Sequence, residues 1–164
     1  MRRREAKRNV TDILRSARFT ADEKICRMLE RETGDRKEAI LYLHGTLANQ
    51  NKDDSSRMDA GKILEALDKK EAAKAYLDIL KDEKDNIWIR CSAMTFFVRD
   101  KSFYEDPELL KKLIYALSPI ASNTREEPET IVKQASATLA VIYNKPEDEI
   151  PRKTRELLAE YRDY

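Results

Sequence analysis

Apolar side chains recur every three or four residues along most of the chain, which is the spacing of amphipathic helices. Polar capping residues or prolines precede most of these stretches, as they do at helix N-termini. No stretch alternates strictly between apolar and polar positions, so the pattern predicts an all-α fold without a sheet. About nine helices are expected, over residues 5–17, 20–34, 35–48, 55–67, 69–82, 86–99, 107–117, 128–144 and from 151 onward.

The stretch 86–99 is apolar around most of the circumference of its predicted helix, so it is expected to have neighbours on several sides. This makes it the central helix of the predicted core. Its only semi-polar positions form one narrow stripe, made of Trp88, Ser92, Thr95 and Arg99.

The predicted helices form pairs, and the pairs resemble one another in sequence. Residues 56–60 (Ser-Arg-x-x-Ala) match residues 89–93 (Ile-Arg-x-x-Ala) at a spacing of 33. A third copy, residues 132–136 (Val-Lys-x-x-Ser), follows 43 after the second, with the excess assigned to a long connection over 118–127. Helix pairs at a fixed period are typical of an α-solenoid.

One helix pair holds the most complete copy of this motif, made of Leu77, Leu80, Asp82 and Asp85 followed by Trp88, Ile89, Arg90 and Ala93. Through these residues the chain resembles the HEAT repeat family, especially the short repeats of phycobilisome-lyase-like HEAT proteins. The resemblance covers roughly residues 35–144 and is best over 71–98. The resemblance implies an α-α superhelix, in which a turn aspartate and an early arginine of the second helix form a ladder between repeats. It also implies that the second helices line a concave binding face.

The whole chain is predicted to be one domain with three parts. Residues 1–34 form a helical cap, 35–144 hold three degenerate repeats, and 145–164 form a C-terminal capping helix. The repeats depart from the family pattern, because Lys52 and Pro128 stand where the second copy has Asp85. Lys133 likewise stands where the second copy has an arginine.

The predicted concave row is the candidate binding site. A tryptophan and an arginine on a semi-polar surface are typical of a protein-binding hot spot. The alternative is that Trp88 merely covers the neighbouring helix over 55–67. The row comprises Trp88, Ser92, Thr95 and Arg99, with Asp59 and Lys62 from the first copy and Thr138 from the third.

Charge adds one asymmetry. Charged residues make up 38% of the chain and the net charge is +1, but residues 1–18 alone carry +5. This basic helix is either the solvated face of a cap or a contact for nucleic acid or an anionic membrane surface. The residues for a weak nucleic-acid contact are Arg2, Arg3, Arg4, Lys7, Arg8 and Arg15.

No catalytic or metal-binding pattern is visible. The single histidine, His44, falls on an inward helix face, where a core role is expected and no second histidine completes a metal site. Cys26 and Cys91 are expected to be buried thiols in a reducing compartment, with the cytoplasm as the default. With only three glycines, the chain offers no phosphate-binding loop, so neither cofactor nor metal is expected.

The resulting expectation is a non-catalytic scaffold that binds another protein through its concave face. Nucleic-acid binding is the first alternative. A HEAT-type enzyme, such as a lyase or a DNA glycosylase, is the second and comes only from the resemblance. No run of about 18 apolar residues is present, so no transmembrane helix is expected.

Overall fold

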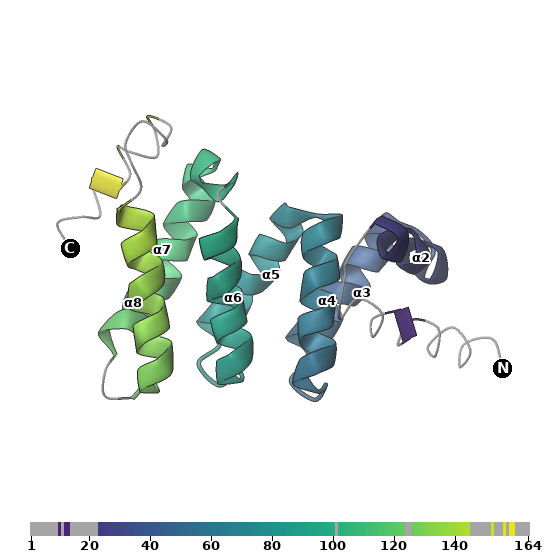
Figure 1. Ribbon diagram of the computed structural model, residues 1–164, viewed down its shortest axis with the longest axis horizontal. Coiled ribbons are helices and arrows are strands. Elements are labelled where there is room, and N and C mark those ends of the chain that lie inside the picture. Colours follow the sequence, from purple (N-terminus) through teal and green to yellow (C-terminus); the bar gives the residue numbers. More distant parts are fainter. Residues whose placement is uncertain are drawn as a thin grey trace. The chain divides into compact units, whose positions relative to one another are not determined.

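The computed structural model describes residues 23–100, 102–123 and 126–144, and the single positions 10, 12, 13, 152, 156, 158 and 159. Within these residues the chain is all-helical and has no strand, which confirms the predicted all-α class. The described residues hold seven α-helices and one 3-10 helix, whereas about nine helices were expected over the whole chain. The first and last predicted helices lie mainly outside the described residues. The elements are α2 (Glu23–Thr33), α3 (Arg36–Ala48), α4 (Asp54–Leu67), α5 (Lys69–Lys81), α6 (Ile87–Arg99), η1 (Ser102–Glu105), α7 (Pro107–Ser122) and α8 (Glu129–Tyr143). Figure 1 labels the seven α-helices.

The chain forms two compact units, residues 1–76 and 77–164, and α5 runs from one into the other. Each unit is described by itself.

Short polar side chains fix where the helices begin. Asp35, Asp53 and Asp106 each accept a hydrogen bond from the backbone N–H three residues later, at 2.9 to 3.1 Å. Asp68 does the same for Glu71 at 3.1 Å. These bonds satisfy N–H groups that have no partner within the helix, so the capping residues set the helix boundaries.

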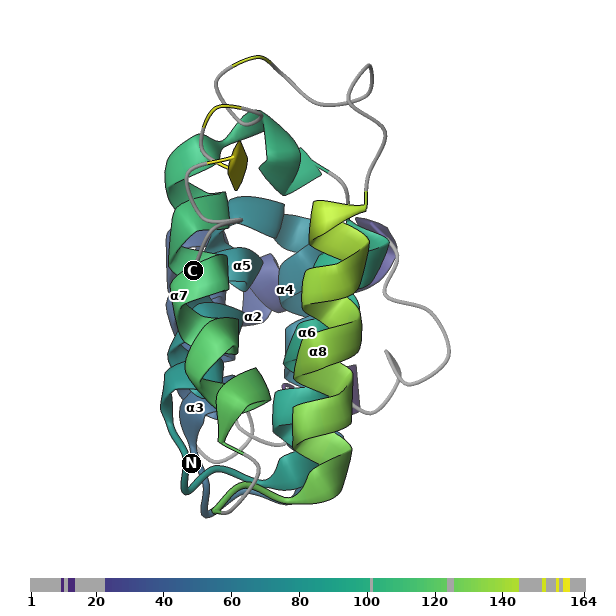
Figure 2. The same cartoon turned by 90° about the vertical axis from the view of Figure 1, so that its left-hand side faces the viewer.

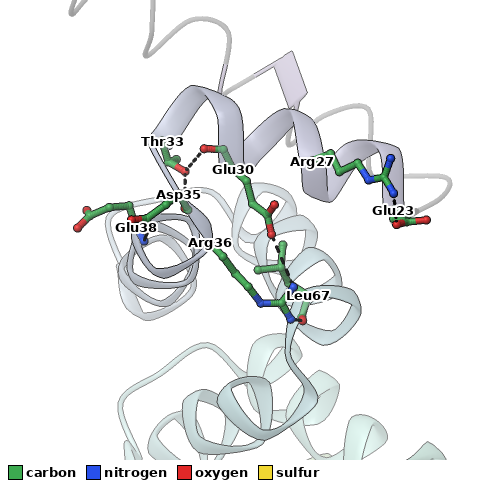
Figure 3. A network of polar contacts seen from close by, with 8 residues as sticks. All are labelled: Glu23, Arg27, Glu30, Thr33, Asp35, Arg36, Glu38 and Leu67. Atoms are coloured by element: carbon green, nitrogen blue, oxygen red, sulfur yellow. Dashed lines mark hydrogen bonds and ion pairs between the residues drawn. The ribbon is translucent and has the colours of Figure 1, made fainter.

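In the first unit, α2 packs against α3 and α4, and α3 packs against α4. Gly34, with a φ of 122°, ends α2 in a conformation that suits glycine. Arg36, the first residue of α3, links all three helices. Its guanidinium donates to the Leu67 carbonyl at the end of α4, and one guanidinium nitrogen lies 3.6 Å from a carboxylate oxygen of Glu30 on α2 (Figure 3). The core includes Leu29, Leu43, Leu47, Ile63 and Leu64.

The second unit is built around α8, which packs against both α6 and α7; Figure 2 shows α7 and α8 side by side. The 3-10 helix η1 contributes aromatic rings to this core. The Phe103 ring packs edge-on against Phe97, with ring centroids 5.5 Å apart, and stacks on Tyr104, with centroids 4.9 Å apart. The Tyr104 hydroxyl reaches the Val141 carbonyl near the end of α8 at 3.4 Å.

The end of α7 differs from the prediction. The helix passes the expected end at residue 117 and continues to Ser122, with Pro119 inside it. The sequence instead predicts a connection over residues 118–127. Proline lacks the N–H that would bond the Tyr115 carbonyl, so a proline at this depth normally weakens a helix. Pro119 is exposed, and Asn123 donates to the Pro119 and Ile120 carbonyls, so the last turn has backbone partners of its own.

Candidate binding face

The candidate face starts from the cap of α6. The Asn86 side chain accepts a hydrogen bond from the Trp88 N–H at 2.8 Å, and the Asp85 carboxylate accepts one from the Asn86 N–H at 2.6 Å. These bonds fix the first turn of α6. Ile89, Ala93 and Phe97 are buried on the other side of the helix. The stripe of Trp88, Ser92, Thr95 and Arg99, called the α6 stripe from here on, is therefore turned outward.

Trp88 is the most exposed large hydrophobic side chain among the described residues, with 66% of its surface accessible. Ser92 donates to the Trp88 carbonyl at 2.8 Å, and Thr95 donates to the Cys91 carbonyl at 2.9 Å. Both hydroxyl hydrogens therefore bond to the helix itself. The stripe offers a partner the indole ring of Trp88, the two small side chains and the exposed Arg99. Two thirds of the Trp88 side chain is left uncovered by the described residues around it.

The buried positions of α8 follow those of α6 at a spacing of 42, and not 43 as the sequence comparison predicts. Buried Ile131, Ala135 and Thr138 follow buried Ile89, Ala93 and Phe96 at that spacing. The excess of nine over 33 comes from three places. The capping residue of α7 lies 38 after that of α5, which accommodates η1, and α7 has 16 residues where α5 has 13. The step from the end of α7 to the cap of α8 is also one residue longer than the step from the end of α5 to the cap of α6.

This register changes the predicted site. Thr138 is only 1% exposed and donates to the Gln134 carbonyl at 2.8 Å, so it belongs to the core of the unit. The positions of α8 that correspond to exposed residues of α6 are themselves exposed. Trp88, Thr95 and Arg99 correspond to Thr130, Ala137 and Val141. These three residues form the α8 stripe together with Lys133, which is exposed although its α6 counterpart, Cys91, is half-buried.

Lys133 is also not the counterpart of a buried arginine. Its side chain is exposed and forms an ion pair with Glu129 one turn earlier, at 2.5 Å. At a spacing of 42, the residue that corresponds to Arg90 is Val132.

Two predicted residues, Asp59 and Lys62, lie on α4 in the first unit, whereas the α6 stripe lies in the second. Asp59 is buried, and Lys62 is half-buried with its ammonium 4.0 Å from the Asp59 carboxylate. The outward positions of α4 that precede Trp88 and Arg99 by 33 residues are Ser55 and Ala66, and both are exposed.

Arg90 and Glu127 form a buried ion pair that the sequence comparison missed. Two guanidinium nitrogens of Arg90 donate to the two carboxylate oxygens of Glu127 at 2.7 and 2.8 Å. Glu127 lies 42 after Asp85, so it takes the acidic turn position that the 43-residue spacing had given to Pro128. Comparing the helix caps, rather than the Arg-x-x-Ala motif, would have found this register.

Arg57 is the equivalent arginine of the first unit and is equally buried. Its Nε donates to the Leu47 carbonyl at 2.7 Å, whereas the Nε of Arg90 has no hydrogen-bond partner among the residues that the structure describes. Both arginines therefore serve packing and do not belong to the exposed stripes.

Cys91 and His44 are two of the side chains that the sequence offers for a catalytic or metal-binding role. Burial raises the pKa of the Cys91 thiol above 9.0, an effect that nearby Arg90 partly offsets, so the thiol stays protonated at neutral pH and is a weak nucleophile. His44 is half-buried, with Nε2 at 3.6 Å from the Glu71 carboxylate. Within the ranges 23–100, 102–123 and 126–144, no three His, Cys, Asp or Glu side chains gather as a metal site would require.

The predicted nucleic-acid residues Arg2, Arg3, Arg4, Lys7, Arg8 and Arg15 lie outside the described residues. Among the helices that the structure describes, none combines the length and apolar composition needed to span a lipid bilayer. Comparison with known proteins gives no family: no family model, no curated protein and no solved structure matches the chain.

Proposed function

We propose that this chain is a HEAT-like, non-catalytic interaction module that binds a partner protein through the α6 and α8 stripes. The observation that carries the proposal is the exposure of Trp88 on a helix whose other sides are buried. Leaving an indole ring in water forgoes stabilisation on the order of 2 kcal/mol that its burial would give. A partner surface that covers the ring would recover it.

The distribution of charge supports a protein partner. In a chain with 38% charged residues, the α6 stripe has one charge, on Arg99. The α8 stripe also has one, on Lys133, and the Glu129 carboxylate neutralises it. Protein interfaces are depleted of charge at their centre, whereas nucleic-acid interfaces are strongly basic. The stripes therefore fit a protein better than a phosphate backbone.

The HEAT-like character rests on internal repetition. α3 and α5 have buried residues at equivalent positions 33 apart, such as Leu43 with Tyr76 and Leu47 with Leu80. The Arg90–Glu127 pair joins the second helix of one repeat to the turn of the next, as the ladder of the HEAT family does. The buried and half-buried thiols of Cys26 and Cys91 support a reducing compartment such as the cytoplasm.

The test is affinity capture with tagged full-length protein and two matched variants. Trp88→Ala removes the exposed ring of α6, and Tyr115→Ala removes a ring of similar exposure, 57%, from α7. We expect Trp88→Ala to lose proteins that the wild type and Tyr115→Ala retain. Equal recovery by all three chains would refute the proposed face.

Trp88 is the only tryptophan, so its fluorescence reports on this face alone. Addition of a captured partner should shift the emission to shorter wavelength and protect the ring from iodide. A partner that binds without changing either property binds elsewhere on the chain.

A further inference from the structure

We draw no further inference here: the strongest candidate, the open pocket on the outer side of α2 lined by Glu23, Arg27, Met28 and Arg31, has all its described lining on one helix, and nothing in the structure shows what covers it.

Discussion

Arg90 holds both carboxylate oxygens of Glu127 with two of its guanidinium nitrogens, and both side chains are almost completely buried. The pair connects the first turn of α6 to the residue before the cap of α8. Two parallel hydrogen bonds between charged groups fix orientation as well as distance. The pair therefore sets how α8 lies along α6, and with it the alignment of the two stripes.

Removing one partner of this pair should be strongly destabilising. In Glu127→Ala the Arg90 guanidinium stays buried without an anion, and the expected loss in the free energy of unfolding is about 3–5 kcal/mol. Urea unfolding followed by circular dichroism measures it.

A double variant separates the ion pair from simple packing. Arg90→Met with Glu127→Leu removes both charges and keeps apolar volume, so it should be more stable than Glu127→Ala alone. If the double variant were less stable than the single one, the buried charge would not be the cause of the loss.

Gly61 is expected to tolerate no side chain. A Cβ at this position would clash with the Tyr76 hydroxyl oxygen and lie 3.2 Å from the ring carbon that bears it. Gly61→Ala should lower the free energy of unfolding by about 1–3 kcal/mol, the usual range for overpacking. Gly45→Ala is the matched control, because its Cβ would meet nothing within 4 Å, and it should stabilise the protein by about 0.5–1 kcal/mol.

Tyr76→Phe tests the origin of the Gly61 effect. The change removes the hydroxyl that donates to Glu65 at 2.8 Å, which should cost about 1 kcal/mol in the wild type. In the Gly61→Ala background it also removes the closest clash, so the two effects should not add. Strict additivity in thermal unfolding would show that the hydroxyl is not what excludes the alanine.

Asp53 should make stability depend on pH in the acid range. Hydrogen bonds from the Ser56 backbone N–H and hydroxyl hold the pKa of Asp53 below its usual 3.8. A carboxyl whose pKa is lowered by folding stabilises the native state above its unfolded pKa, and this stabilisation is lost as the pH falls through the folded pKa. Asp53→Ala should therefore be less stable than wild type by about 1 kcal/mol at pH 7.

The difference between wild type and Asp53→Ala should shrink when unfolding is measured at pH 2. Asp53→Asn is the control, because its amide oxygen can still accept from the Ser56 N–H but does not titrate. If the free energies of unfolding of wild type and Asp53→Ala differed by the same amount at pH 7 and pH 2, the carboxylate would be excluded as the stabilising group.

Much of the fold could be predicted because its determinants are local. The caps at Asp35, Asp53 and Asp106 are short-range signals, and the helical spacing of apolar residues predicted which side of α6 is buried. The outward position of Trp88 follows from the same spacing. These features depend on residues within one or two turns of each other.

The register of the third repeat could not be predicted in the same way. The Arg-x-x-Ala motif is absent from α8, and a shift by one residue exchanges buried Thr138 for exposed Ala137. The continuation of α7 through Pro119 also depends on what surrounds the helix, because an exposed site lets solvent replace the missing hydrogen bond. Glu127 was missed because α8 lacks the Arg-x-x-Ala motif, so the comparison set the spacing at 43 and assigned the acidic turn position to Pro128.

Replacing Pro119 by alanine should raise the free energy of unfolding. Alanine restores the N–H that can bond the Tyr115 carbonyl, and near a helix end the expected gain is about 1 kcal/mol, less than the roughly 3 kcal/mol of a helix interior. Differential scanning calorimetry of Pro119→Ala should show a higher melting temperature. Pro107→Ala is the comparison, since proline suits the first position of α7 and its removal should bring no gain.

Trp88→Ala should separate binding from folding. Most of the side chain is in solvent, so its removal should change the free energy of unfolding by no more than about 0.5 kcal/mol, the usual range for surface positions. Phe97→Ala, on the buried side of the same helix, should cost about 3–5 kcal/mol. Chemical denaturation of the two variants gives the comparison. A loss approaching that of Phe97→Ala would mean that Trp88 supports the fold, and reduced capture of partners by Trp88→Ala could then be explained by unfolding alone.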